Sequence, residues 1–221
     1  MKIRDNENLV VLGIFLALVS LLSALVLAVV SGFTARPISA AKKAREAQAL
    51  RQILPEFDND INAKTLTLKS PAKWRIQVRA ARKNGKLVGY AALAVNPAGY
   101  AGAVKMLAGV NPDGTIRAIL VTEQHETPGL GAELCKRQFS RTIFNLTEPT
   151  PAGLPPNRYL DQFNGRKVPA KGWVISKDGG DALYHTGATV TSRAIAKSAS
   201  EIALAFQKGR RQLSKAFGGV K

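Results

Sequence analysis

One uninterrupted apolar stretch dominates the start of the chain. Residues Asn8 to Ala35 carry no charge, and the apolar centre of this segment runs from Leu9 to Val30. The hydrocarbon core of a bilayer needs about 20 apolar residues as a helix, whereas the apolar region of a cleaved secretory signal has about 7–15. The length therefore favours an uncleaved, single-span membrane anchor over residues 1–36, with a cleaved signal as the alternative.

Basic residues lie on both sides of this span. Lys2 and Arg4 precede it, and four more basic residues lie between positions 36 and 45. Under the positive-inside rule, such residues collect on the cytoplasmic side of a membrane. The flanking charges therefore do not favour an extracytoplasmic location for the residues that follow the span.

Residues 37–71 are predicted to form a short amphipathic helix and a linker. Ser39 can cap the helix at its start and Pro55 ends it after Leu54. The residues from 57 to 71 are polar, which is typical of a loop. The apolar face of the helix is formed by Ala44, Ala47, Leu50 and Leu54.

The middle of the chain alternates between short apolar runs and turn residues. Asn84-Gly85, Asn96-Pro97 and Asp113-Gly114 separate the runs, as expected for short connections between strands. The pattern predicts an antiparallel meander of four strands, at Trp74–Arg82, Leu87–Val95, Val104–Val110 and Ile116–Thr122.

The last third of the chain predicts a mixture of helix, loop and strand. One apolar stripe, with Ile195, Ile202 and Phe206 on it, makes residues 190–208 the strongest helix, followed by a solvated basic tail over 209–221. The fold class is α+β: an antiparallel-sheet domain over residues 72–208 behind a single N-terminal transmembrane helix. Weaker predictions are a helix over 132–144, a proline-rich loop over 147–156 and a strand over 168–176.

Composition narrows the chemistry that this domain can carry. The chain holds 32 Lys and Arg against 15 Asp and Glu, a net charge of +17, which suggests an anionic partner. The first 36 residues hold three basic and two acidic side chains, so nearly all of this excess belongs to the remainder. A single cysteine, Cys135, excludes an internal disulfide and a multi-cysteine iron–sulfur or zinc site, and no metal site is expected.

Two glycine-bearing segments are candidates for ligand contact. Glu126–Gly131, ETPGLG, predicts a tight loop whose glycines let backbone approach a flat ligand. Lys177–Ser192, KDGGDALYHTGATVTS, leads into the long final helix, whose free amides favour a phosphate. Taken separately, each has an ordinary interpretation, the first as a turn and the second as a helix with a threonine cap.

Taken together and in order, these segments resemble the FMN-binding domain family. The resemblance runs from about Tyr90 to Phe206 and rests on GYAGAVKMLAGVNPDGTI at 99–116, HETPGLG at 125–131 and TGAT at 186–189. The family includes the G subunit of the Rnf electron-transport complex and the C subunit of the sodium-pumping NADH:quinone oxidoreductase. Length and the KDGGD run make the sequence more similar to the Rnf branch.

The resemblance implies a cofactor and a site for it. It implies that FMN is joined to Thr189 by a phosphoester bond, made by a flavin transferase that uses FAD and Mg²⁺. Thr186, Gly187 and Ala188 would complete the attachment motif, and Thr127, Gly129 and Leu130 would line the ring or the ribityl chain. The flavin would do the redox chemistry, so no residue of the chain is expected to be catalytic.

Two positions depart from the family pattern. Gln124 stands where a histidine often lies, two residues before Glu126. Leu183 stands where an aspartate often lies, six residues before the threonine that carries the flavin, and Asp181 is two positions further away. The second departure, at Leu183, changes a position that belongs to the pattern recognised by a flavin transferase.

The resemblance implies an electron-transfer subunit of a membrane complex that couples electron flow between ferredoxin and NAD to ion transport. Its partners would be the complex's membrane and iron–sulfur subunits, at the bacterial cytoplasmic membrane, with the folded domain on the extracytoplasmic side. The alternatives are an anchored non-redox module that binds anionic lipid or nucleic acid, and a covalent-flavin carrier outside the Rnf complex. Nucleic acid is disfavoured because the basic residues are not interleaved with aromatic residues.

Overall fold

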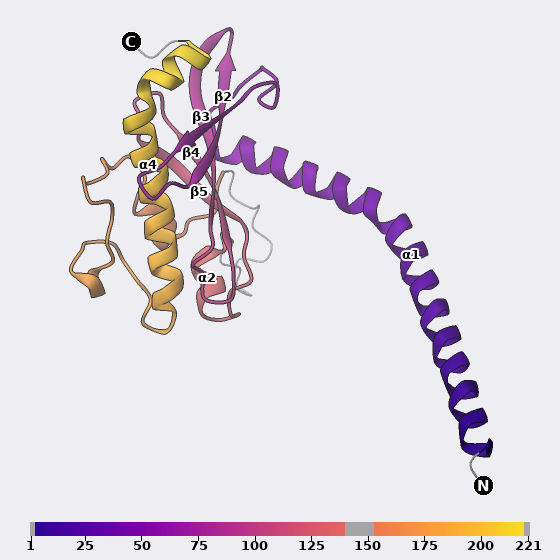
Figure 1. The fold of residues 1–221 in the computed structure, drawn as a ribbon. Coiled ribbons are helices and arrows are strands. Elements are labelled where there is room, and N and C mark those ends of the chain that lie inside the picture. The colour runs from indigo at the N-terminus through magenta and orange to yellow at the C-terminus, as the bar shows by residue number, and fades with distance from the viewer. Residues whose placement is uncertain (1–2, 140–152, 219–221) are drawn as a thin grey trace, which may run out of the picture. The chain divides into compact units, whose positions relative to one another are not determined.

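The computed structural model describes residues 3–139 and 153–218 (Figure 1). The chain divides into two units, Met1–Ala47 and Gln48–Lys221. The first unit is helical, and the second contains the sheet and all of the remaining elements.

Helix α1 (Ile3–Ile53) is continuous from the apolar segment into the second unit. It is long and apolar enough to cross a membrane, and it is the one such helix among the described residues. The separate amphipathic helix predicted from Ser39 is wrong, because Ser39 lies inside α1 and its hydroxyl donates 2.8 Å to the carbonyl of Arg36. The predicted end is close, since α1 stops two residues before Pro55.

Five strands form one antiparallel sheet in the order β1-β2-β3-β4-β5, which confirms the predicted meander. The ends of four strands lie within one residue of their predicted positions. The fifth, β1, falls in a segment that the sequence pattern predicts as a linker, and that prediction is wrong. The bounds are β1 (Thr65–Lys69), β2 (Arg75–Lys83), β3 (Lys86–Asn96), β4 (Val104–Val110) and β5 (Ile116–Glu123).

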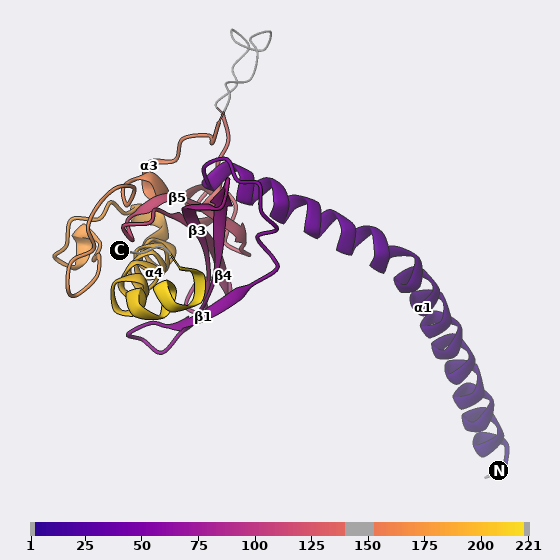
Figure 2. The same ribbon diagram turned by 90° about the horizontal axis from the view of Figure 1, so that it is seen from above.

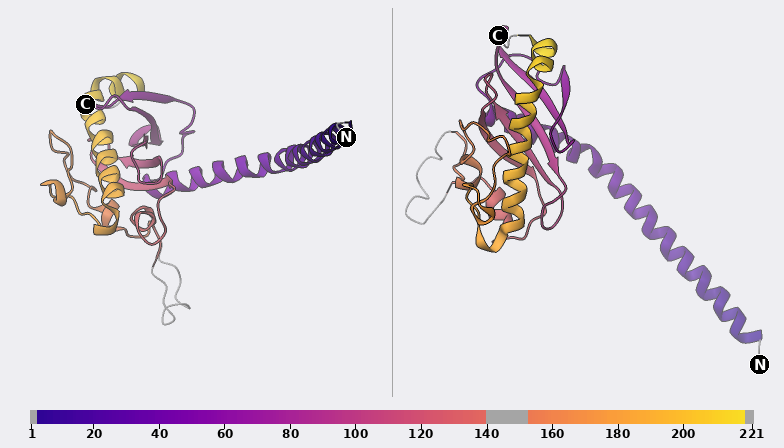
Figure 3. Two further views of the ribbon diagram at one scale, coloured as in Figure 1. Left: turned by 60° about the horizontal axis from the view of Figure 1, so that its bottom comes forward. Right: turned by 60° about the vertical axis from the view of Figure 1, so that its left-hand side comes forward.

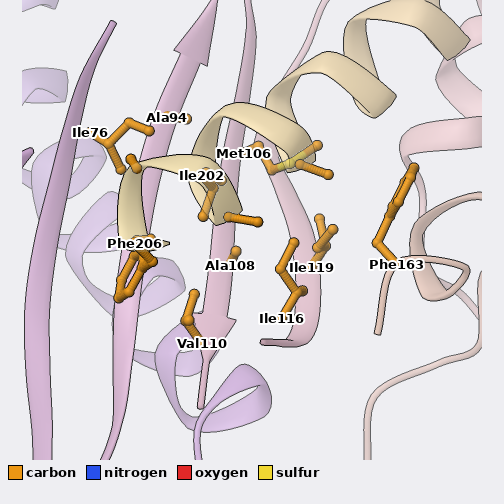
Figure 4. Close-up of a cluster of buried hydrophobic side chains, with 14 of the residues drawn as sticks. Ile76, Ala94, Met106, Ala108, Val110, Ile116, Ile119, Phe163, Ile202 and Phe206 are labelled. Carbon is orange, nitrogen blue, oxygen red and sulfur yellow. The ribbon is translucent and has the colours of Figure 1, made fainter. Parts of the chain in front are cut away.

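Both faces of the sheet are covered. Alternate residues of a strand point to opposite faces, and in β3 Tyr90 and Ala92 belong to the main core while Ala91 belongs to a second cluster. Figure 4 shows the main core, in which Ile76, Met106, Ile116 and Ile202 come from the sheet and the final helix. The second cluster includes Ala49, Leu50, Ile53, Leu54 and Ile61, which follow the start of the second unit.

Helix α4 (Thr189–Phe217) lies along one face of the sheet (Figures 2 and 3) and is nine residues longer than predicted at its C-terminal end. Leu213 and Phe217 are buried in the main core, so residues 209–217 continue the helix instead of forming a solvated tail. Gly209 packs against Leu68 of β1, since a Cβ at Gly209 would lie 2.9 Å from a Leu68 methyl carbon. Arg82 donates to the carbonyl of Phe217, which satisfies an acceptor at the end of the helix.

Short helices and loops connect β5 to α4. They are α2 (Gly131–Cys135), α3 (Arg158–Asp161), and the single 3₁₀ turns η1 (Ser176–Asp178) and η2 (Thr186–Ala188). The helix predicted over 132–144 is wrong in its described part. Helix α2 ends at Cys135, where the side-chain amide of Asn157 donates to the carbonyls of Leu134 and Lys136.

Two further predictions fall in this region. The strand predicted over 168–176 is wrong, because its only pairing is the isolated bridge between Ile175 and Ala182. Pro169 lacks an amide hydrogen, and Gly172 has a φ of +81°, which an extended strand does not adopt. Of the proline-rich loop, residues 147–152 lie outside the described residues, and residues 153–156 contain neither helix nor strand, as predicted.

Candidate functional site

The two glycine-bearing segments meet at the start of α4. Figure 1 shows α2 and the start of α4 at the same end of the sheet. A Cβ at Gly187 would lie 2.8 Å from a Leu130 methyl carbon, and one at Gly131 would lie 2.5 Å from the Thr191 hydroxyl. The ETPGLG loop and the TGAT turn are therefore in direct contact, although about 60 residues separate them in the chain.

Glu126 lies at the centre of this contact. Its side chain is buried, and its Oε2 accepts a hydrogen bond from the Thr191 hydroxyl at 2.6 Å. Its Oε1 accepts from the backbone amide of Tyr100 at 2.8 Å. One carboxylate thus joins the loop between β3 and β4, the ETPGLG loop and the first turn of α4.

The ETPGLG loop is a tight turn, as predicted. The amides of Leu130 and Ala132 both donate to the carbonyl of Thr127, at 3.2 and 3.1 Å. Gly129 has a φ of +75°, which strongly favours glycine. The predicted site residues Thr127, Gly129 and Leu130 are all exposed on this turn.

The TGAT segment forms one 3₁₀ turn, η2, and then the first residue of α4. His185 holds the turn, because its Nδ1 accepts from the amide of Gly187 at 3.2 Å. Thr189 begins α4, one residue earlier than predicted, and the cap residue is Ala188, which offers no side-chain hydrogen bond. The ordinary interpretation of this segment as a threonine cap is therefore wrong. The first amides of α4 have no intrahelical acceptor, so they form an electropositive end.

The hydroxyl groups around this turn are not equivalent. Thr191 is buried and donates to Glu126. Ser192 is also buried, donating to the carbonyl of Ala188 and accepting from the amide of His185. Thr186 is exposed and Thr189 is half-buried, with the Thr189 oxygen 3.4 Å from the carbonyl of Thr186. Of these hydroxyls, those of Thr186 and Thr189 are the accessible ones.

Apolar side chains are exposed on the same segments. Leu130 and Val190 are each 40% exposed, and Leu183 is 49% exposed. Leu183 is held through its backbone, because its amide donates to Oε1 of Gln162 at 2.6 Å. Asp181 pairs with Arg166, so its carboxylate is already engaged.

Three further residues have structural roles. Trp173 is buried with its ring centroid 5.0 Å from that of Phe163. Glu126 makes structural hydrogen bonds, although its partners Tyr100 and Thr191 carry no signal in the sequence. Cys135 is buried, and this burial, together with the negative charge of Glu126, raises the pKa of its thiol to about 12.

No group of His, Cys, Asp and Glu side chains suited to a metal ion occurs in the part of the chain that the structure describes. The groups gathered at this site are instead hydroxyls, helix amides, glycine backbone and exposed apolar side chains. Such a set suits a phosphorylated ligand with a flat apolar ring.

Comparison with known proteins places the same region in a family. Residues 99–203 match the FMN-binding domain family, and this range contains both glycine-bearing segments. The chain is 32% identical over 207 residues to the G subunit of the ion-translocating oxidoreductase complex of Photorhabdus laumondii, covering 88% of each chain. It is 33% identical over 224 residues to the G subunit of Cereibacter sphaeroides, covering 95% of this chain and 90% of the relative. For the G subunit of Haemophilus influenzae strain Rd, the identity is 30% over 195 residues, covering 87% of each chain.

Proposed function

Since the chain belongs to the family of G subunits of ion-translocating oxidoreductase complexes, we propose that it carries electrons on an FMN joined to Thr189 by a phosphoester bond. The family makes it an FMN-binding electron-transfer subunit of a redox-driven, ion-translocating membrane complex. The covalent bond and the residues that hold the flavin are the parts that we propose. The observation that supports them most directly is the contact between the ETPGLG loop and the TGAT turn.

The residues at the contact fit FMN. The amides that begin α4 suit a phosphate group, and a phosphodiester on Thr189 would keep one negative charge beside them. Gly187 and Ala188 are small, so a modifying enzyme can reach the hydroxyl between them and Val190. The exposed side chains of Leu130 and Val190 offer apolar surface to a flat ring.

The attachment is a group transfer without any change of oxidation state. The Thr189 oxygen forms a bond to the phosphorus of the FMN half of FAD, and the bond from that phosphorus to the bridging oxygen breaks. AMP leaves, and the hydroxyl proton passes to solvent or to a base of the flavin transferase. The ester keeps the cofactor from being lost, and the bound flavin supplies the electron transfer.

The buried hydroxyls explain why Thr189 is the proposed site. Esterification of Thr191 or Ser192 would require a buried oxygen to give up its present hydrogen bond. Thr186 is accessible, but it precedes the small residues of the turn and lies three positions before α4 begins. Thr189 alone combines an accessible hydroxyl with a place in the first turn of the helix.

We further propose that α1 is the only membrane span and that the folded domain lies on the extracytoplasmic side of the bacterial cytoplasmic membrane. The apolar segment contains no ionisable residue between Asn8 and Ala35, so it offers no path for the transported ion. The ion path would belong to other membrane subunits, and iron–sulfur subunits would exchange electrons with the flavin. Protease treatment of spheroplasts tests the location, because protection of residues 54–221 would place the domain in the cytoplasm.

Fluorescence on a denaturing gel tests the attachment. The full chain, expressed with and without its flavin transferase, should give a flavin band at its own mass only when the transferase is present. A band of equal intensity without the transferase would contradict enzyme-made attachment. A chain that binds anionic lipid or nucleic acid and never carries flavin would support the non-redox alternative.

A further inference from the structure

Glu126 is a buried carboxylate to which the proposed function gives no role. Its side chain is 5% exposed, and no basic side chain in the described ranges forms an ion pair with it. Both of its oxygens are nevertheless engaged, one by the amide of Tyr100 and the other by the hydroxyl of Thr191. A buried acceptor is costly unless it is hydrogen-bonded, so loss of the Thr191 hydroxyl would leave one oxygen of Glu126 buried without this partner.

Two glycines from different loops leave room for this carboxylate. A Cβ at Gly99 would lie 2.6 Å from Oε1 of Glu126, and a Cβ at Gly131 would lie 2.7 Å from its Oε2. The end of β3, just before the loop that contains Gly99, is also held to α4, because the side-chain amide of Asn96 donates to the carbonyl of Ala194 at 2.9 Å. The backbone thus closes around Glu126 from two sides, while α4 contributes Thr191.

The first turn of α4 needs such support. Ala188 gives it no side-chain cap, and an uncapped helix end frays more readily. Thr191 is two residues after Thr189, so a bond at Thr191 fixes the turn that presents the Thr189 hydroxyl. We propose that the hydrogen bond between Glu126 and Thr191 is a positioning device that holds Thr189 against the ETPGLG loop, both for flavin attachment and for the geometry of the bound flavin.

This inference rests on the proposed attachment at Thr189, and it makes Glu126 and Thr191 positioning residues. Neither side chain has to touch the flavin. Their contribution is to keep the acceptor hydroxyl and the loop in one arrangement, and a misplaced acceptor lowers the rate of a group transfer strongly. The same misplacement would change the surroundings of the bound ring, which visible circular dichroism detects.

Four variants of the full chain, expressed with the flavin transferase, test the proposal. Thr191→Val removes the hydroxyl, Thr191→Ser keeps it, and Glu126→Met removes both oxygens that accept from Tyr100 and Thr191. Ser200→Ala is the matched control, since Ser200 is another buried hydroxyl of α4, which accepts from the amide of Trp173 at 2.7 Å away from the site. The measurements are the rate of flavin attachment by intact mass and the visible circular dichroism of the flavin-loaded protein.

We expect attachment to slow by about tenfold or more in Thr191→Val and Glu126→Met. Thr191→Ser should restore the rate, and Ser200→Ala should keep both the rate and the spectrum of the wild type. An unchanged rate and spectrum in Thr191→Val, with a loaded wild type, would overturn this inference alone. An equal loss in Ser200→Ala would also overturn it, because general destabilisation would then explain the effect. A wild type that never accepts flavin would remove the proposed function, and this inference with it.

Discussion

Thr191, in the first turn of α4, donates a 2.6 Å hydrogen bond to the buried carboxylate of Glu126, 65 positions earlier in the chain. This bond connects the two segments that carry the resemblance to the FMN-binding domain family. It brings the glycine loop after β5 to the start of the helix where Thr189 presents its hydroxyl. A pair of separate sequence motifs thereby becomes one site.

Gly131 and Gly129 should respond differently to substitution by alanine. A Cβ at Gly131 would collide with Thr191 and Glu126, so Gly131→Ala should displace the loop and destabilise the domain by about 2–3 kcal/mol, more than Gly129→Ala. Gly129 has open space around it and a φ of +75°, so Gly129→Ala should cost only about 1 kcal/mol of backbone strain. Thermal unfolding of both variants measures the difference. Equal stability of the two would contradict the close packing at Gly131.

The end of α4 should contribute to stability although its sequence is basic. Leu213 is 2% exposed, and Leu213→Ala should lower the free energy of unfolding by about 2–4 kcal/mol. Removal of residues 209–221 should cost more, because it also removes Phe217 from the core. As a control, Arg211→Ala alters an exposed neighbour and should change stability by less than about 0.5 kcal/mol. Denaturant unfolding that is insensitive to the truncation would restore the interpretation as a solvated tail.

The sequence pattern predicts those helices and strands whose own residues show a clear apolar periodicity or a turn signal at their ends. Four strands are predicted because apolar runs alternate with strong turn signals. Strand β1 is not predicted, although its residues Thr65 to Leu68 alternate between polar and apolar, because this short alternation lies in an otherwise polar segment. The pattern ends the final helix too early because Gly209 and the basic run resemble a terminus, whereas Gly209 is a close contact with Leu68.

From the sequence, the two motif segments of the site can be predicted, but the contacts between them cannot. The resemblance points to the ETPGLG and TGAT segments, and the structure places them together. The contacts of Glu126 with Tyr100 and Thr191 join residues 26 and 65 positions apart, and no periodicity encodes such pairs. In the sequence, Gly99 and Gly131 are the only hints of this contact, because a glycine can mark a place where another part of the chain comes close.

Asp161 should stabilise the domain in a pH-dependent way. Burial raises the pKa of its carboxyl, but the hydrogen bonds from Arg137 and the amide of Asn157 outweigh burial and hold the pKa below its ordinary value of 3.8. A lowered pKa gives stability that is present above this value and is lost as the pH falls through the folded-state pKa. Asp161→Asn should therefore cost about 1–2 kcal/mol at pH 7, because the buried Arg137 loses its charged partner, although water partly screens the pair.

The difference between wild type and Asp161→Asn should shrink at pH values below 3.8, as the wild-type carboxyl takes up a proton. Unfolding midpoints measured from pH 7 to pH 3 follow this change. A difference that stays constant over the whole range would show that the charge of Asp161 does not contribute.

Cys135 should be inert in the folded protein. With a thiol pKa of about 12, raised first by burial and then by the charge of Glu126, very little thiolate forms at neutral pH. Iodoacetamide at pH 8 should label the native chain slowly and the denatured chain rapidly. Fast labelling of the native chain would mean that the helix α2 opens readily.

The intact mass of the denatured chain tests the central claim most directly. Wild type made with its flavin transferase should gain the mass of one FMN less one water. Thr189→Val should gain nothing while remaining folded and in the membrane, since the Thr189 hydroxyl makes only a 3.4 Å contact with the carbonyl of Thr186. Ser200→Ala, which changes a hydroxyl of α4 outside the site, is the control and should keep the full adduct. An adduct on Thr189→Val, or none on the wild type in the presence of an active transferase, would contradict the account.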